Sequence, residues 1–292
     1  MQFHVSSHLE YEAKFPSTIL FSIQAQHTDS QVITNESLVF DPPLSYEEIE
    51  VDENRFLRLE TGQEKSIQVT YQATVDSESE LLPAKEIDSM PVSDYGRAAI
   101  PYLFPSRYCQ SDRLGRLAWD LFGAIPTPYE KVIGITDWIH DNVEYVAGTT
   151  DSQTSAYDTV TQRTGVCRDF AHLGIALCRA LNIPARYFTG YAYQLVPQDF
   201  HACFEAYVGG RWMIFDATHL ATLNGLIRIA TGRDAADAAV ASIFGNVTTK
   251  TMQVDCQLVP GQKFEPMTWK QLHRRAVSLE KADETLEDSG GS

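Results

Sequence analysis

The N-terminal part of the chain has the hydrophobic pattern of short β-strands. Residues 18–23 and 67–71 are rich in β-branched and aromatic side chains, and turn-prone segments containing Pro, Gly and Asp lie between them. Such runs are typical of strands joined by turns, and no long helical period interrupts them. The pattern therefore predicts an antiparallel β-sandwich over residues 1–85, with residues 82–91 as the link to a second domain.

After the link, apolar positions recur at the three- and four-residue spacing of helices. Ser111 is placed to cap a helix that ends near Gly123, and a second helix follows Pro128. A third helix is predicted over residues 167–181. It ends there because Pro184 disfavours helical backbone in the residue before it.

Strand-like segments follow the third helix, at residues 186–193, 201–208 and 211–215. Helices followed by an antiparallel sheet indicate an α+β domain. We therefore predict an α+β protein in which the β-sandwich precedes a core of helices packed on an antiparallel sheet, at residues 92–260. Residues 261–292 are predicted to form a C-terminal extension that ends in a solvated tail.

The composition indicates a folded protein and argues against two classes of binding partner. The chain has 292 residues, a formal net charge of −16 and 43% hydrophobic residues. This hydrophobic content is sufficient for a full core, and the length fits two domains. Nucleic acids and anionic membranes bind basic surfaces, so the acidity argues against both as partners. The sequence leaves the oligomeric state open.

The cysteines and the hydropathy pattern together indicate a reducing compartment. The five cysteines are odd in number and widely spread, without a C-x-x-C pair, which disfavours a disulfide framework and a structural zinc site. The chain does not open with a basic segment followed by an apolar run, and no 18 consecutive apolar residues occur. We therefore expect a cytoplasmic protein with free thiols.

Cys167 stands at the start of the third predicted helix, shortly after a glycine. The first turn of a helix leaves backbone N–H groups unpaired and carries the positive end of the dipole, which favours the reactive thiolate. The dipole contributes about 0.3–1 kcal/mol, whereas lowering a thiol pKa from about 8.5 to about 6 requires roughly 3.4 kcal/mol. A nearby imidazolium is therefore needed, and the Cys167 N–H is a candidate oxyanion donor. The alternative is a small buried hydrophobic residue, which is how we interpret Cys178, Cys203 and Cys256.

Residues 201–216 have the pattern of a β-hairpin whose two-residue turn is Gly209-Gly210. In this register His201 lies diagonal to Asp216 on one face, because side chains alternate with period two. A carboxylate placed in this way fixes the tautomer of an imidazole, stabilises its charged form and leaves the other ring nitrogen for a thiol. A three-residue loop would shift the register by one residue and remove this proximity. The alternative roles are a surface histidine for His201 and the closing of a turn for Asp216.

The motifs around these residues resemble those of the transglutaminase-like core of bacterial proteins. They occur in consistent order over about residues 95–220: Gly165-Val166-Cys167-Arg168-Asp169-Phe170-Ala171-His172, Leu181-Asn182-Ile183-Pro184-Ala185-Arg186, Gly190-Tyr191, His201-Ala202 and Trp212-Met213-Ile214-Phe215-Asp216-Ala217-Thr218. Residues 1–80 resemble the β-rich region that often precedes this core. The resemblance implies a papain-like arrangement in which cysteine, histidine and aspartate act in chain order, here as Cys167, His201 and Asp216.

Four further residues are candidates for the substrate cleft, namely Tyr157, Arg168, Tyr191 and Cys203. The family commonly has tryptophan after the His-Ala pair, where this chain has Cys203, and the resemblance places that position along the cleft wall. Tyr157 is a candidate by the resemblance alone. Tyr191 could instead be an ordinary residue of the sheet, and Arg168 could instead be a solvated charge. Asp169 is interpreted as a structural residue that caps the helix or holds a neighbouring loop.

We predict from these residues a thiol enzyme that transfers acyl groups from amide or peptide bonds, by hydrolysis through a thioester on Cys167. A protein or peptide is the expected substrate. The alternatives are amine transfer to protein glutamine, as in transglutaminases, and a non-catalytic binding module on the same fold. No cofactor is expected, and the spacing of the histidines disfavours a metal site.

Overall fold

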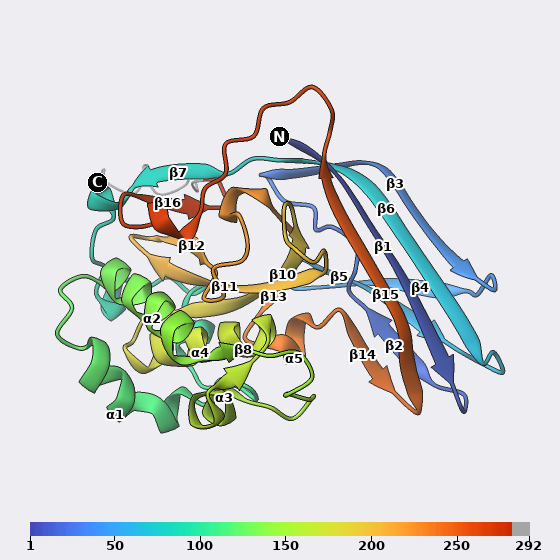
Figure 1. Cartoon of the computed structure of the whole chain (residues 1–292), viewed down its shortest axis with the longest axis horizontal. Helices are drawn as coiled ribbons and strands as arrows, with labels where there is room; N and C mark the ends of the chain where they lie inside the picture. The colour runs from blue at the N-terminus through green and yellow to red at the C-terminus, as the bar shows by residue number, and fades with distance from the viewer. Residues whose placement is uncertain (282–292) are drawn as a thin grey trace, which may run out of the picture.

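The computed structural model describes residues 1–281. It places a β-sandwich of long strands beside a core in which α-helices pack on a smaller sheet (Figure 1). The long strands lie at one end of the molecule and the helices gather at the other, with the core sheet between them in the view of Figure 1. Strands come first along the chain and helices with an antiparallel sheet follow, so the predicted α+β class is confirmed.

Two four-stranded antiparallel sheets form the sandwich. The first has the order β15-β1-β6-β3 and contains β1 (Gln2–Ala13), β3 (Gln31–Asp41), β6 (Ser66–Ser77) and β15 (Val247–Leu258). The second has the order β14-β2-β5-β4 and contains β2 (Thr18–Phe21), β4 (Tyr46–Val51), β5 (Asn54–Glu60) and β14 (Ala241–Phe244). Alternate side chains of β1 and β6 are buried, as expected for strands with one face on a core.

The C-terminal part of the chain returns to this sandwich. β15 pairs with β1 along its whole length, and β14 pairs with β2. From the sequence we had placed residues 241–258 in the helix-and-sheet core, and the pairing puts them in the sandwich instead. Hydrophobic spacing shows that a segment is a strand, but it does not show which distant strand it joins. The predicted domain boundaries near residues 85 and 92 are not decided by these pairings and stay predictions.

The predicted C-terminal extension contributes a strand of its own. β16 (Arg275–Ser278) pairs antiparallel with β7 (Glu80–Pro83), and Val277 and Leu279 are buried. The segment therefore packs on the rest of the protein as far as it is described. The predicted solvated tail lies mostly outside the described residues.

The core sheet is antiparallel with the order β12-β11-β10-β13, and its strands are β10 (Ala185–Ala192), β11 (Phe200–Val208), β12 (Arg211–Phe215) and β13 (Leu226–Gly232). The helices are α1 (Ser111–Phe122), α2 (Pro128–Asn142), α3 (Ala156–Gln162), α4 (Cys167–Ala180) and α5 (Ala235–Ala238). Short elements complete the chain, namely β8 (Glu144–Tyr145), β9 (Thr164–Gly165), and the 3₁₀ turns η1 (Ala84–Glu86), η2 (Val92–Asp94), η3 (Ile100–Leu103), η4 (Leu223–Gly225) and η5 (Trp269–Gln271). Within residues 1–281, no helix combines the length and apolar content that a bilayer crossing requires.

The three predicted helices are confirmed as α1, α2 and α4, and the predicted core strands as β10, β11 and β12. Ser111 does not cap α1, because it is the first helical residue and Gln110 precedes it without a side-chain cap. α2 begins with a capping box between Thr127 and Glu130. We did not predict α3 and β13: the seven residues of α3 are too few to show a helical period, and every residue of β13 is buried, which removes the alternation of a half-buried strand.

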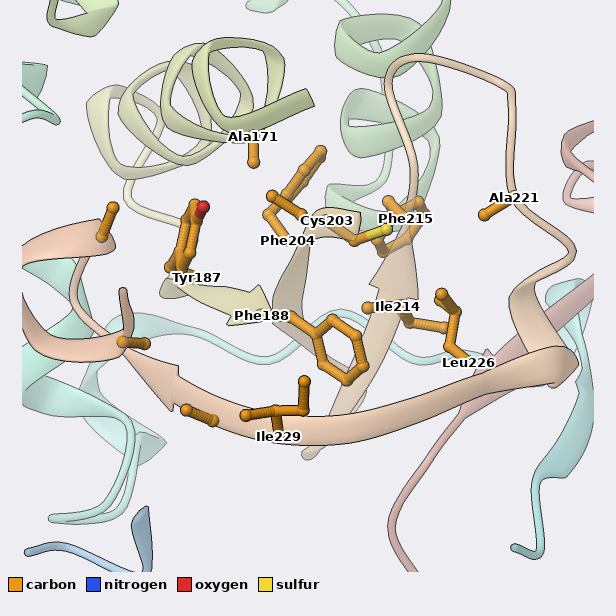
Figure 2. Close-up of a cluster of buried hydrophobic side chains, with 14 of the residues drawn as sticks. Ala171, Tyr187, Phe188, Cys203, Phe204, Ile214, Phe215, Ala221, Leu226 and Ile229 are labelled. Atoms are coloured by element: carbon orange, nitrogen blue, oxygen red, sulfur yellow. The ribbon is translucent and has the colours of Figure 1, made fainter. Parts of the chain in front are cut away.

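A buried hydrophobic cluster joins α4 to the core sheet (Figure 2). The rings of Phe204 in β11 and Phe215 in β12 stack with centroids 5.7 Å apart, and Figure 2 shows Ala171 of α4 facing them. A Cβ atom at Gly174 would lie 2.5 Å from the Phe204 ring, so only glycine lets α4 approach the sheet this closely. This close packing fixes the position of α4, and with it the position of its first residue.

Buried polar side chains fix the other side of the core to the sandwich. The Tyr191 hydroxyl donates to the Ile23 carbonyl at 2.7 Å and lies 3.2 Å from the Ser7 hydroxyl. The Gln31 side chain exchanges hydrogen bonds of 2.8 and 2.9 Å with the backbone of Arg228 in β13. Removing one partner of a buried hydrogen bond leaves an unsatisfied polar group, so the sandwich and the core stabilise each other.

Candidate active site

Cys167 is the first residue of α4, and its side chain is partly exposed. All five cysteines lie within the described residues, and the other four are buried. The chain enters α4 through Gly165, where an added Cβ would lie 2.8 Å from the Cβ of Asp169. Glycine therefore permits the tight entry that places the thiol at the helix N-terminus, as predicted from the sequence.

The Asp169 carboxylate caps the start of α4. Its Oδ2 accepts a hydrogen bond from the Val166 N–H at 3.0 Å, while the N–H groups of Asp169 and Phe170 donate to the Val166 carbonyl. Its Oδ1 accepts from the Arg168 guanidinium at 2.8 Å, which also donates to the Asp151 carbonyl at 2.6 Å. The interpretation of Asp169 as a cap is confirmed. Arg168 is held by these two partners, and its role toward a substrate stays a prediction.

The β11–β12 hairpin has the predicted register. Gly209 and Gly210 form its turn with φ values of +61° and +78°, the left-handed conformation that favours glycine. The pairing then continues in the predicted step along both strands. It brings His201, near the start of β11, beside Asp216, which directly follows β12.

His201 and Asp216 form a buried pair. His201 Nε2 and Asp216 Oδ2 are 3.0 Å apart, and each side chain is 2% exposed. The same Oδ2 accepts hydrogen bonds from the N–H groups of Leu220 and Ala221, and Oδ1 accepts from the N–H and the hydroxyl of Thr218. The loop after β12 thus holds the carboxylate in one orientation, and the carboxylate holds the ring.

Burial opposes both charges of this pair, and their mutual attraction outweighs burial. Burial alone would raise the pKa of Asp216, but the charge of His201 and hydrogen bonds from the ring, Ala221 and Thr218 bring it down to about 2. Burial alone would lower the pKa of His201, but the Asp216 carboxylate holds it well above its ordinary value. The pair is therefore an imidazolium and a carboxylate at neutral pH.

The Cys167 thiol reaches the same ring. It lies close enough to His201 to raise the pKa of the imidazole, after the larger effects of Asp216 and Cys203. Because Nε2 faces Asp216, the other ring nitrogen, Nδ1, is left for the sulfur. The structure thus brings together the three residues that the sequence singled out, from α4, from β11 and from the loop after β12. An imidazolium beside a sulfur stabilises the thiolate.

Two of the four predicted cleft residues are buried. Cys203 is 1% exposed and belongs to the hydrophobic cluster of Figure 2, where burial raises the pKa of its thiol to about 12. Tyr191 is 0% exposed, and its hydroxyl is bound to the sandwich. Neither offers a surface to a substrate, so the prediction that they line the cleft is wrong. β10 and β11 are buried on both faces, and alternation along a strand does not distinguish two buried faces from one.

Tyr157, in α3, lines a groove of about 470 Å³ between α1, α2 and α3. The Arg113 guanidinium lies over its ring, 3.5 Å from the centroid. Trp138 and Arg163 also line this groove, and Cys167 is not among the lining residues. A contact between Tyr157 and a substrate stays a prediction.

Tyr145 is a neighbour of Cys167 that we did not find from the sequence. β8 pairs in parallel with β9, so Tyr145 lies opposite Gly165, two residues before the nucleophile. Burial, followed by the adjacent Cys167 thiol, raises the pKa of Tyr145 to about 12. A two-residue strand has no hydrophobic period, so nothing in the sequence pattern indicates this proximity.

His201, Cys203 and Asp216 are also candidate metal ligands, since one ligand atom of each lies within 4.8 Å of the other two. Both oxygens of Asp216 are already engaged by the loop after β12 and by the ring. A cation would have to displace these donors from a site that is closed to solvent. The donor set therefore fits the holding of a proton better than the binding of a metal.

Two regions of the chain match known family models. Residues 116–217 match the transglutaminase-like superfamily, and residues 1–94 match the bacterial transglutaminase N-terminal domain. The crystal structure of a candidate cysteine protease from Cytophaga hutchinsonii is 53% identical, with a TM-score of 0.92 over 95% of this chain and 97% of that chain. An uncharacterised protein of Mycobacterium leprae (strain TN) is 32% identical over 120 residues, which are 38% of this chain. The match spans 43% of that curated relative, less than half of its length.

Proposed function

Since the chain belongs to the transglutaminase-like superfamily, we propose that it transfers acyl groups from amide or peptide bonds to water through a thioester on Cys167. One observation carries this proposal: the His201 ring lies between the buried Asp216 carboxylate and the only cysteine of the described residues that is not buried. A nucleophile, a base within reach and a group that orients the base are the parts that thiol acyl transfer requires.

In the first half-reaction the Cys167 thiolate attacks the carbonyl carbon of an amide. A carbon–sulfur bond forms, and the electron pair of the C=O double bond moves onto the oxygen. When the intermediate collapses, the C–N bond breaks and the departing amine takes a proton from the His201 imidazolium. Asp216 keeps the ring in place and stabilises its charged form before this transfer.

In the second half-reaction water attacks the thioester. The neutral His201 ring accepts a proton from the water, a carbon–oxygen bond forms and the thiolate departs. The products are a carboxylic acid and the regenerated thiolate–imidazolium pair. An amine in place of water would give amine transfer by the same steps, and the experiment below separates the two acceptors.

We also propose a protein or peptide substrate and a cytoplasmic location. The similarity to a candidate cysteine protease supports a peptide bond as the acyl donor. The free state of all five cysteines supports a reducing compartment. The net charge of −16 disfavours nucleic acid and anionic membrane as partners.

The test is to trap the thioester. The protein is mixed with p-nitrophenyl acetate near pH 7, and intact and peptide mass spectrometry locate the acetyl group over time. We expect acetylation of Cys167, followed by its loss to water, and the absence of both in Cys167→Ala. His201→Gln is expected to acetylate much more slowly, while His4→Gln, a variant of an exposed histidine on β1 of the sandwich, serves as the matched control.

Three outcomes would contradict the proposal. Acetylation of another cysteine with Cys167 unmodified would show that Cys167 is not the nucleophile. Equal acetylation rates in His201→Gln and the control would show that the ring does not assist the thiol. Deacylation that is slow in water and is accelerated strongly by added methylamine, with N-methylacetamide as the product, would replace hydrolysis by amine transfer.

A further inference from the structure

A second cluster of histidines lies beside the loop after β12. His219 belongs to that loop, Asp137 and His140 lie three residues apart on one face of α2, and His273 follows η5. These segments are distant from one another in the chain, so the spacing of the histidines in the sequence does not reveal the cluster. None of the four residues takes part in the acyl transfer proposed above.

His219 is buried without a hydrogen-bond partner. Its side chain is 4% exposed, and neither Nδ1 nor Nε2 has a hydrogen-bond partner within residues 1–281. The ring stacks on those of His140 and Trp269, with centroids 4.0 and 4.2 Å away. Buried polar atoms of native proteins nearly always have a partner, so the ring nitrogens of His219 point to a ligand.

The Asp137 carboxylate faces two imidazoles. His219 Nε2 lies 3.5 Å from Oδ1, and His273 Nε2 lies 3.7 Å from Oδ2. Burial, followed by the nearby His140, lowers the pKa of His219 to about 4, so this ring is neutral at pH 7 and does not balance the carboxylate. A carboxylate oxygen and imidazole nitrogens are donors that divalent transition metals prefer.

The distances between these atoms suit donors to a single ion. Two donors at about 2.0–2.2 Å from a tetrahedral zinc ion lie about 3.3–3.6 Å from each other. The separation of 3.5 Å for His219 falls in this range, and that of 3.7 Å for His273 is just above it. The three donors do not yet meet at one point, because the two rings approach different oxygens of the carboxylate.

We propose that Asp137, His219 and His273 bind a divalent first-row transition-metal ion such as Zn²⁺. The ion lies between the carboxylate and the edge of the His219 ring. The His273 side chain is 64% exposed, and its rotation toward Asp137 brings in the third donor, while water completes four-coordination. The proposal does not depend on the acyl transfer proposed above, because Cys167 supplies no ligand.

The ion joins three segments next to Asp216. The N–H of His219 donates to the Asp216 carbonyl at 3.2 Å, and the N–H groups of Leu220 and Ala221 donate to Asp216 Oδ2. With the ion bound, His219 ties this turn to α2 and to the segment after η5. The ion therefore restrains the loop that orients the carboxylate, and it takes no part in the reaction itself.

Metal binding is tested in Cys167→Ala, where the thiolate no longer competes for the ion. After removal of metal by a chelator, we expect calorimetry to show one bound Zn²⁺ per chain. Co²⁺ is expected to give the visible d–d bands of a four-coordinate ion without a sulfur charge-transfer band. Adding His219→Ala, His273→Ala or Asp137→Asn is expected to weaken Zn²⁺ binding by more than about 100-fold, since partners that only orient a ligand contribute about 10–100-fold.

The controls and the effect on the loop are measured in the same background. His4→Ala on β1 and Asp29→Asn between β2 and β3 are the matched controls, and both are expected to bind Zn²⁺ with unchanged affinity. Hydrogen exchange, followed by mass spectrometry, is expected to slow at Leu220 and Ala221 when Zn²⁺ is added. The addition of His219→Ala is expected to abolish this slowing.

Other results would overturn the inference. Cys167→Ala that binds no Zn²⁺ would refute the site, and a sulfur charge-transfer band would place the ion at Cys203 instead. Equal affinities in the ligand variants and the controls would place it at other residues, and unchanged exchange in the bound protein would refute the restraint of the loop. Should His219→Ala unfold, His273→Ala and Asp137→Asn decide the matter, because both side chains are partly exposed. Acetylation of Cys167 is a separate measurement and tests the proposed function alone.

Discussion

Replacing Asp216 by asparagine isolates the charge of the carboxylate from its role in holding the His201 ring. The Oδ2 atom accepts from the ring and from the N–H groups of Leu220 and Ala221. An amide NH₂ at this place would face three donors, so the asparagine oxygen is expected to occupy it. The NH₂ then faces the Thr218 N–H, at the cost of one unsatisfied buried donor, about 1–3 kcal/mol. The ring keeps its acceptor and loses the negative charge.

The size of the effect follows from the carboxylate. The pKa of Asp216 is about 2 against an ordinary value of 3.8, so the folded protein favours the charged form by about 2 kcal/mol, at 1.36 kcal/mol for each pKa unit. Burial and the hydrogen bonds from Ala221 and Thr218 also enter this net value, so it gives the order of magnitude of the attraction that the carboxylate and the imidazolium share. Loss of about 2 kcal/mol corresponds to roughly a 30-fold smaller population of the thiolate–imidazolium pair near neutral pH.

The assay is the pH profile of Cys167 alkylation by iodoacetamide, followed by mass spectrometry. At pH 6 we expect Asp216→Asn to react roughly 30-fold more slowly than the parent protein. The two rates are expected to converge above pH 9, where a thiol ionises without assistance. Asp29→Asn, an exposed carboxylate in the segment between β2 and β3, is the matched control. Thermal unfolding of each variant separates an effect on the pair from a loss of structure.

A folded Asp216→Asn protein that is alkylated at pH 6 as fast as the control would refute this reasoning. It would show that the charge on Asp216 does not sustain the imidazolium. A slower rate that persists unchanged to high pH would refute it in another way, because it would point to a displaced ring and not to a missing charge.

Further predictions concern stability. Gly174→Ala places a Cβ 2.5 Å from an aromatic ring of β11 and is expected to cost about 1–3 kcal/mol in urea unfolding, whereas Gly115→Ala in α1, with open space around the added Cβ, is expected to stabilise by about 0.5–1 kcal/mol. Glu205→Ala removes a fully buried carboxylate from two buried arginines and leaves them Glu280 as their remaining acidic partner. The change is expected to cost about 3–5 kcal/mol, with a smaller loss for Glu205→Gln, and an unchanged urea midpoint would contradict this. Because the folded pKa of Asp216 is depressed, its contribution of about 2 kcal/mol is present above pH 4 and is lost as the pH falls toward 2, so Asp216→Asn should unfold with a weaker dependence on pH in this window.

The elements that the sequence predicted correctly are those with a local period or a local turn. α1 and α2 each bury one stripe of side chains, and that stripe is visible as a three- and four-residue spacing. α4 is buried on all sides from Asp169 to Arg179, and the spacing of its larger apolar residues still indicates a helix. The β11–β12 register followed from a single two-residue turn, since Gly209-Gly210 fixes which residues face each other. That register is sufficient to place His201 beside Asp216 from the sequence alone.

The features that the sequence did not reveal depend on contacts between distant segments. β15 lies beside β1 although the two come from opposite ends of the chain. Tyr145 reaches Cys167 through a parallel ladder of two residues, too short to leave a pattern. The resemblance placed Cys203 along the cleft wall, but α4 and the sheet close over it. In each case the three-dimensional neighbour, and not the residue itself, decides the role.

The sandwich has a structural function that precedes any role in substrate capture. Its side chains supply hydrogen-bond partners to the buried backbone of β13: Gln31 binds Arg228, and Asn54 exchanges bonds of 2.6 and 3.0 Å with Thr231. β13 in turn pairs with β10, which pairs with the strand that carries His201. Each buried group that lost its partner would cost about 1–3 kcal/mol, so several such losses are comparable with the whole stability of an ordinary domain. The sheet that positions the imidazole therefore depends on the sandwich for its fold.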